Sequence, residues 1–321
     1  MWIRTRCSNA CGQRFPRRRS HPVSNANQSP APERLLRRLE WRVIRRLDGL
    51  FQGDYRTLFY GTGIDFADLR LYQPEDDIRH IDWNVTARMN QLHVRQYVED
   101  RELTAWFLLD LSPSMAFGPV DRTKQDLLVD LTVTLARLLT RDGSRVGAIL
   151  YTDRIEGIIP PLTGRRQVLR LTRDLLRPRE ISSAHTTDLA ALMNAGLNAV
   201  KRRSLIFVIS DFISPPGWEQ PLAMLNQRHE LIALRLLDPR ETELPDAGLI
   251  VVEDSETGEH LYVDTADPGF RRRFAEAAAR REATLARSAT RAGADLFAVS
   301  TEEDLAKAVV RLATLRQRRR R

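Results

Sequence analysis

The residues best suited to chemistry in this chain are oxygen donors, and they stand at three separate places in the sequence. Asp110, Ser112 and Ser114 stand at alternate positions directly after an apolar run. Thr187 precedes a helical pattern, and Asp211 follows a second apolar run. Alternate residues in a tight turn can point at one place, so the first three could share a cation. Carboxylate and hydroxyl oxygens suit Mg²⁺ or Ca²⁺ better than zinc. Few carboxylates would hold the ion weakly and leave a position for an acidic group on a partner.

The elements that must position these donors are strands and helices that alternate from residue 103 onward. The expected strands are 103–109, 145–151, 155–159, 204–209, 231–237, 249–253, 260–264 and 294–299. The expected helices are 121–140, 164–176, 188–202, 218–228, 268–291 and 301–315. This alternation predicts an α/β fold with a doubly wound, mainly parallel sheet. Ligands bind such sheets beyond the carboxyl ends of the strands, where the strand order reverses, so the donors lie at the expected edge.

The first hundred residues divide into two segments. Residues 1–32 are rich in Arg, Ser, Asn and Pro without apolar periodicity, which predicts a disordered basic tail. Pro32 opens an amphipathic helix, and residues 33–100 hold this helix, an irregular segment and a strand expected at 92–98. A basic amphipathic helix can lie on a membrane surface, or it can pack on its own domain with arginine stems covering apolar edges. We favour the packed helix, followed by an α/β domain over 101–316 and a basic tail over 317–321.

Composition and charge limit the class of protein. The chain has 321 residues, 42% of them hydrophobic, and a formal net charge of +8. The excess arginines lie in the two terminal segments, whereas a nucleic-acid groove needs positive charge on a folded face, so no specific nucleic-acid partner is expected. The tails could touch an anionic membrane surface weakly. No apolar run is long enough to cross a bilayer and no secretory signal opens the chain, so a cytoplasmic location is expected.

Other motifs give weaker evidence for a binding site. Cys7, Cys11 and His21 could form part of a zinc site, but no second pair of ligands accompanies them, and tail cysteines are more often bystanders. The glycines near residue 61 lack the third glycine of a dinucleotide loop, and no G-x-x-x-x-G-K-[ST] sequence occurs. Any ATP hydrolysis should therefore belong to a partner.

Two resemblances emerge from these residues. The pattern Asp110-x-Ser112-x-Ser114, followed by a Thr and later by an Asp at a strand end, resembles the metal-ion-dependent adhesion site of von Willebrand factor A domains. The upstream segment resembles the signature of the bacterial domain-of-unknown-function family fifty-eight, in the residues Gly61-x-Gly63-x-Asp65-Phe66, Arg70-x-Tyr72, Pro74-Glu-Asp-Asp77-x-Arg79-x-Ile81-Asp82-Trp83 and Ala87-Arg88. The family usually has Pro-Gly-Asp-Asp, and Glu75 stands at the glycine here.

The resemblance implies a von Willebrand A-like domain that makes no chemical change itself. Members are associated with a MoxR-type AAA+ ATPase and are thought to act as its partner or adaptor in maturing or assembling client proteins. The implied ligands of Mg²⁺, or of another divalent cation, are Asp110, Ser112, Ser114, Thr187 and Asp211. Thr187 is chosen over Thr186 because it directly precedes Asp188 at the helix start. Many relatives carry membrane-spanning helices, and this chain resembles the shorter form without them.

An enzyme is the alternative. A Mg²⁺-dependent phosphohydrolase of the haloacid-dehalogenase kind would use Asp110 as its nucleophile. That chemistry needs a second carboxylate two residues on, as general acid, where Ser112 stands. It also needs a lysine that neutralises the phosphate. The lysines of the chain are Lys124, Lys201 and Lys307, and Lys201 is the candidate for this role.

Overall fold

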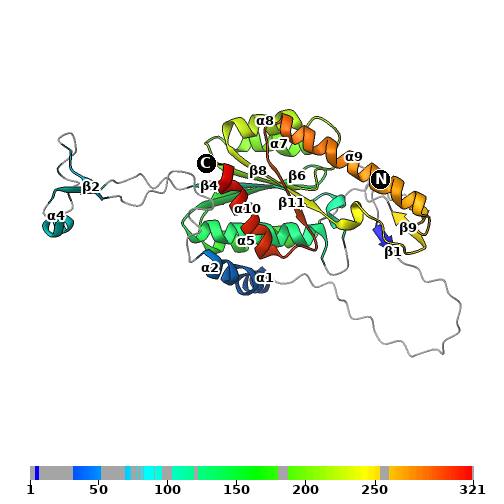
Figure 1. Cartoon of the computed structure of the whole chain (residues 1–321), viewed down its shortest axis with the longest axis horizontal. Coiled ribbons are helices and arrows are strands. Elements are labelled where there is room, and N and C mark those ends of the chain that lie inside the picture. Colours follow the sequence, from blue (N-terminus) through cyan, green and yellow to red (C-terminus); the bar gives the residue numbers. More distant parts are fainter. Residues whose placement is uncertain are drawn as a thin grey trace, which may run out of the picture.

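The computed structural model of the chain has a central sheet between two helical layers (Figure 1). It describes residues 4–6, 32–51, 69–73, 78, 81, 83–89, 91–95, 103–118, 122–179, 187–253 and 260–319. The six-stranded sheet has the order β11-β8-β7-β4-β5-β6. Its strands are β4 (Thr104–Asp110), β5 (Arg145–Tyr151), β6 (Ile155–Leu162), β7 (Leu205–Ser210), β8 (Glu230–Leu237) and β11 (Leu296–Ser300). All neighbouring pairs are parallel except β5 with β6, which confirms the predicted doubly wound, mainly parallel sheet.

The central strands are buried on both faces, as their continuous apolar runs require. Phe107 of β4 lies opposite Phe207 of β7, and the two rings stack with their centroids 4.9 Å apart. Ala105, Phe107 and Leu109 of β4 join one hydrophobic core, and Trp106 and Leu108 join the other. Since successive side chains of a strand point to opposite faces, this strand needs a helical layer on each side.

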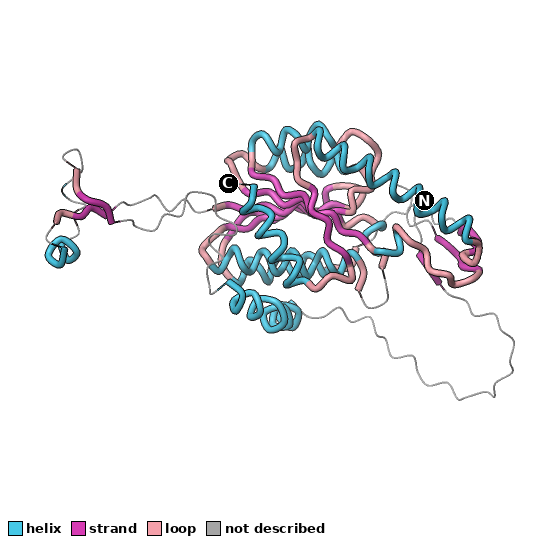
Figure 2. Tube along the Cα trace, viewed as in Figure 1, coloured by secondary structure: helices cyan, strands magenta, loops and turns pink. Residues whose placement is uncertain are grey.

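Those two layers are plain in Figure 2. The first consists of α5 (Lys124–Arg141), α6 (Arg165–Leu176), α10 (Leu305–Arg319) and the N-terminal helices. The second consists of α7 (Leu189–Ala199), α8 (Glu219–Arg228) and α9 (Pro268–Arg291). Helix α10 begins four residues later than the sequence predicts because Asp304 accepts a hydrogen bond from the Lys307 N–H and so starts the helix there. It also continues to Arg319, into the segment predicted to be a tail from residue 317.

The N-terminal helix packs on the domain, as we favoured. It runs as α1 (Pro32–Leu39), a π-helical turn η1 (Glu40–Ile44) and α2 (Arg45–Phe51). Leu36 and Leu47 are fully buried within the first core. The apolar face is therefore covered by the protein itself and is not free to enter a membrane surface. None of the helices among the described residues is both long and apolar enough to span a bilayer.

Two small sheets accompany the main one. β9 (Leu249–Glu253) pairs antiparallel with β10 (His260–Asp264) and with β1 (Arg4–Arg6). These three residues of the segment 1–32 pair with a strand edge of β9 that no local pattern reveals. β2 (Leu69–Leu71) pairs with β3 (His93–Arg95), near α4 (Trp83–Met89). Cys7, Cys11, His21 and the glycines near residue 61 lie outside the described residues, as do residues 96–98 of the strand expected at 92–98.

Candidate metal centre

The chain reverses its direction of strand addition between β4 and β7. From β4 it first adds β5 on one side, then returns and adds β7 on the other. This reversal is the point at which doubly wound sheets bind ligands, because the loops after the two strands diverge there. Asp110 ends β4 and Asp211 follows β7, so the two carboxylates meet at one edge of the sheet.

Asp110 is fully buried and held by hydrogen bonds from both sides. Its Oδ1 accepts from the Ser112 N–H at 3.0 Å, and its Oδ2 accepts from the Ser210 hydroxyl at 2.6 Å. Burial and the neighbouring negative charge of Asp211 raise the pKa of Asp110 to about 6, against the lowering effect of those hydrogen bonds. A divalent cation beside Asp110 would offset both effects, because it neutralises the carboxylate and replaces its lost hydration.

Ser112 and Ser114 stand in the loop after β4, where residues Pro113–Ala116 form a short 3₁₀ helix, η3. Both serines are buried, and their hydroxyl oxygens lie 3.1 Å apart. Adjacent oxygen ligands of an octahedral Mg²⁺ at 2.0–2.1 Å are about 3 Å from each other. The separation of the two hydroxyls therefore fits neighbouring positions around one such ion.

Thr187 lies at the same edge, as its chain neighbours show. The Asp188 N–H donates to the Tyr151 hydroxyl at 3.0 Å, and Tyr151 pairs with Asp110 between β5 and β4. The Leu189 N–H donates to the Ser214 hydroxyl, in the loop after β7. Thr187 is buried, and the residues that follow it bond to the end of β5 and to the loop after β7. His185 and Thr186 lie outside the described residues.

A buried lysine beside Asp211 is a feature that the sequence interpretation missed. The Lys124 ammonium group donates to Asp211 Oδ2 at 2.7 Å and to Glu241 Oε1 at 2.6 Å. We call Lys124, Asp211 and Glu241 the lysine triad. Burial alone would lower the pKa of Lys124, but the charges of the two carboxylates outweigh it and the pKa is raised. The ammonium group is therefore a fixed positive charge within the site.

One signal in the sequence could have located Lys124. It lies three, four and seven residues before the buried leucines 127, 128 and 131, on the apolar stripe of α5. A lysine on such a stripe must find carboxylate partners, because an unpaired buried charge is strongly unfavourable. Glu241 gives no comparable signal, since it reaches the triad from η4 (Pro239–Glu241), a short 3₁₀ helix after β8.

The loop after β7 is also fixed. Phe212 has a φ of 56°, a left-handed conformation that costs energy for a residue other than glycine. Its N–H donates to the Ser210 hydroxyl, and the Ile213 N–H donates to Asp211 Oδ1 at 3.0 Å. The Phe212 ring packs edge-on against Trp218. Asp211 is thus held by Lys124 through one oxygen and by the backbone through the other.

The structure therefore brings Asp110, Ser112, Ser114 and Asp211 together and places Thr187 at the same edge. We call these five residues the donor set. In the described part of the chain no group of three or more His, Cys, Asp or Glu residues is arranged to hold a metal. A metal here would depend on the hydroxyls as well as the carboxylates, which suits a hard cation such as Mg²⁺ and not zinc.

This sheet order, the two helical layers and the edge where the loops of β4 and β7 meet define a von Willebrand A-like α/β domain. The chain belongs to the family described as "Protein of unknown function DUF58", which it matches over residues 68–284. It is 38% identical over 283 residues to "Uncharacterized protein Rv1480" of Mycobacterium tuberculosis, covering 88% of this chain and 89% of that one. It is 35% identical over 160 residues to "Uncharacterized protein MAV169" of Mycobacterium avium, covering 50% of this chain and 94% of that one.

Solved structures show more distant likenesses. BatB from Bacteroides thetaiotaomicron, described as a conserved hypothetical protein, has a TM-score of 0.44 at 14% identity, over 68% of this chain and 99% of that one. An aerotolerance-related membrane protein from Bacteroides fragilis has a TM-score of 0.43 at 15% identity, over 66% of this chain and 97% of that one.

Proposed function

We propose that this chain is a protein-interaction module that binds its partner through Mg²⁺ or another divalent cation held by the donor set. The observation that carries the proposal is the buried Asp110 carboxylate with two serine hydroxyls beside it, 3.1 Å apart. A cation would stabilise the ionised form of this carboxylate, which burial and the charge of Asp211 disfavour.

The lysine triad explains how the cation would remain open to a partner. The Lys124 ammonium group engages Asp211 Oδ2, and the Ile213 N–H engages Oδ1. Asp110 is then the carboxylate best placed to bind the cation directly, and the serine and threonine hydroxyls are neutral ligands. A divalent cation so held keeps part of its charge and can accept a carboxylate from another protein.

We propose a MoxR-type AAA+ ATPase as that partner, with its client proteins as further partners. The support is the resemblance of the signature segment and the membership of DUF58. The chain itself carries no phosphate-binding loop sequence, so ATP hydrolysis would belong to the ATPase. The module would present or position client proteins during maturation or assembly, in the cytoplasm.

The proposal treats the chain as non-catalytic. A phosphohydrolase of the haloacid-dehalogenase kind needs a general acid where Ser112 stands, and the Ser112 hydroxyl lies against Ser114. It also needs a lysine free to meet a phosphate, whereas Lys124 is enclosed between Asp211 and Glu241. Mg²⁺-dependent phosphatase turnover that Asp110→Asn abolishes would favour the enzyme instead.

The experiment is a binding measurement between this chain and a purified MoxR-type AAA+ ATPase. Wild type, Asp110→Asn and Asp238→Asn are compared with and without Mg²⁺. Asp238 is a matched control because it is a buried aspartate after β8 whose oxygens serve Thr301 and the Arg240 N–H. We expect Mg²⁺-dependent binding that Asp110→Asn abolishes and Asp238→Asn retains. Binding that is the same with and without Mg²⁺ and is unchanged in Asp110→Asn would contradict a metal-bridged contact.

A further inference from the structure

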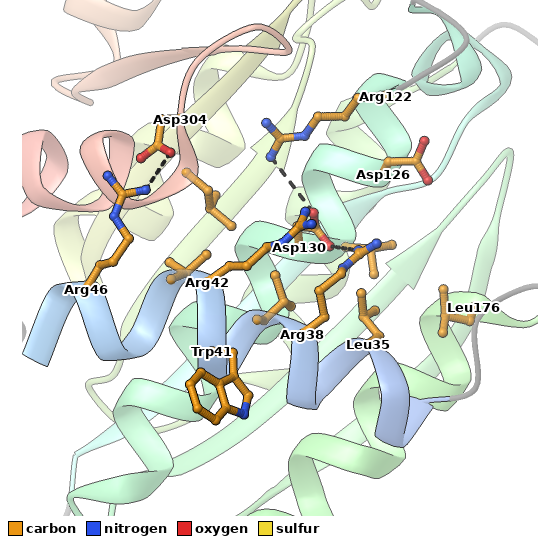
Figure 3. Close-up of a pocket in the computed structure, with 14 residues that line it drawn as sticks. Leu35, Arg38, Trp41, Arg42, Arg46, Arg122, Asp126, Asp130, Leu176 and Asp304 are labelled. Carbon is orange, nitrogen blue, oxygen red and sulfur yellow. Dashed lines mark hydrogen bonds and ion pairs between the residues drawn. The ribbon is translucent and has the colours of Figure 1, made fainter.

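A second charged region lies on the outer side of α5, away from the candidate metal centre. A cavity of about 710 Å³ is lined by residues of the N-terminal helices, of α5 and of the start of α10. Figure 3 shows arginines from α1, η1 and α2 reaching across it toward aspartates on the opposite wall. We call this cavity the arginine groove, and the charged residues that matter are Arg38, Arg42, Arg46, Arg122, Asp130 and Asp304.

The groove has more guanidinium groups than carboxylates to pair with them. Asp130 serves two arginines, Arg38 at 3.2 Å and Arg122 at 4.0 Å. Arg46 pairs with Asp304 at 2.9 Å. Arg42 has no carboxylate within ion-pair distance in the part of the chain that the structure describes.

The remaining aspartate of the groove reduces this imbalance but does not remove it. Asp126 accepts hydrogen bonds from the Thr123 N–H and hydroxyl, and so belongs to the N-terminal cap of α5. Its carboxylate still carries a negative charge, so four arginines and three aspartates leave the lining with one positive charge that a carboxylate from elsewhere could neutralise.

The rim next to Arg42 has the side chains typical of a protein interface. Trp41 is 66% exposed, and the Arg45 guanidinium lies 3.6 Å from the centre of its ring. Exposed tryptophan and arginine are enriched where proteins bind one another, because they combine apolar area with directed hydrogen bonds. Trp41 and Arg42 both belong to the π-helical turn η1, and both line the groove.

We infer that the arginine groove binds an acidic peptide segment of a partner protein. The carboxylates of the peptide would pair with Arg42 and with Arg38 and Arg122, the two arginines that share Asp130. Guanidinium groups hold carboxylates in a planar, two-bonded geometry, which favours a peptide carboxylate over a diffuse charge. The inference goes beyond the proposed function, since this site uses neither the donor set nor a metal.

An anionic lipid surface fits the groove less well. A recess lined by residues of three helical segments cannot follow a flat membrane surface. The apolar face of the same helices is buried in the core and has nothing to insert. A peptide with spaced carboxylates can place each one between the aspartates.

The test is fluorescence polarisation of a fluorescein-labelled deca-glutamate peptide, in EDTA so that no metal-bridged contact contributes. The double variant Arg42→Glu/Arg45→Glu is compared with Arg280→Glu/Arg287→Glu, which makes the same charge change at exposed positions of α9 on the other helical layer. We expect the groove variant to weaken binding at least tenfold and the control variant less than twofold.

Three outcomes would overturn the inference. One is the absence of saturable binding by wild type, and another is an equal loss in the two variants, which would indicate diffuse attraction to a basic protein. The third is tighter binding to phosphatidylglycerol vesicles than to the peptide, lost in the groove variant, which would assign the groove to lipid. Because EDTA is present throughout, failure here leaves the metal proposal standing.

Discussion

The two charged regions beside α5, the lysine triad and the arginine groove, differ most in their access to water. In the lysine triad the side chains of Lys124 and Asp211 are both 0% exposed, and their contact is 2.7 Å. In the arginine groove the side chains of Arg46 and Asp304 are 55% and 41% exposed, at a similar distance of 2.9 Å. The two ion pairs therefore have similar lengths but are expected to contribute differently to stability.

Burial decides what each region can do. An exposed pair contributes little, because water screens it and each group keeps much of its hydration. Removing one member of a buried pair leaves the other as an uncompensated charge. We therefore expect the triad to be essential for the fold and the site, and the groove to be nearly neutral for stability and available for binding.

The largest effect is expected from Lys124→Met. It removes the ammonium group and leaves Asp211 and Glu241 close together and buried. Breaking buried pairs costs about 3–5 kcal/mol, so the free energy of unfolding in urea should fall by that order. Mg²⁺ should recover part of the loss, since it supplies positive charge at the same edge. Arg46→Met is the matched control, and an equal loss in both variants would contradict the comparison.

A smaller effect, of opposite sign, is expected from Asp110→Asn without metal. The folded-state pKa of Asp110 is about 6, above the ordinary value of about 3.9 in an unfolded chain. Ionised Asp110 therefore destabilises the metal-free protein at pH 8. The isosteric amide should raise the free energy of unfolding by about 1–2 kcal/mol in EDTA and remove the stabilisation that Mg²⁺ gives wild type. A metal-free Asp110→Asn protein less stable than wild type would contradict the role of burial here.

The same group predicts a pH dependence. Between about pH 4 and pH 6 folded Asp110 keeps a proton that the unfolded chain has released, so its contribution to stability falls as pH rises through that window. The difference in unfolding free energy between wild type and Asp110→Asn isolates this contribution from other titrating groups. It should grow from pH 4 to pH 7 in EDTA and shrink or reverse in saturating Mg²⁺. A difference that does not change with pH would show that Asp110 is not a buried, titrating carboxylate.

The smallest effect is expected in the groove. Arg46→Gln removes the exposed contact with Asp304 and should change the free energy of unfolding by less than about 1 kcal/mol. Urea unfolding at low and at high salt measures it, and the change should be smaller at high salt because screening already weakens the pair. A loss as large as that of Lys124→Met would place the groove among the structural ion pairs.

Much of the fold could be predicted from the sequence because the strands β4 and β7 are continuous apolar runs and the helices have clear apolar stripes. The edge of the sheet that carries Asp110 and Asp211 followed from the rule for doubly wound sheets. The contact of Lys124 with Glu241 did not, because it joins residues 117 positions apart through a short 3₁₀ helix without periodicity. Strand β1 was missed for the same reason, since it pairs with β9, which lies far away in the sequence.

The most direct test of the central claim is isothermal titration of EDTA-stripped protein with MgCl₂ and MnCl₂. We expect one saturable site in wild type and in Asp238→Asn, a weakened site in Ser112→Ala and in Ser114→Ala, and none in Asp110→Asn. Wild-type protein that takes up neither ion at millimolar concentration, or an Asp110→Asn protein that binds as wild type does, would contradict a metal centre between β4 and β7.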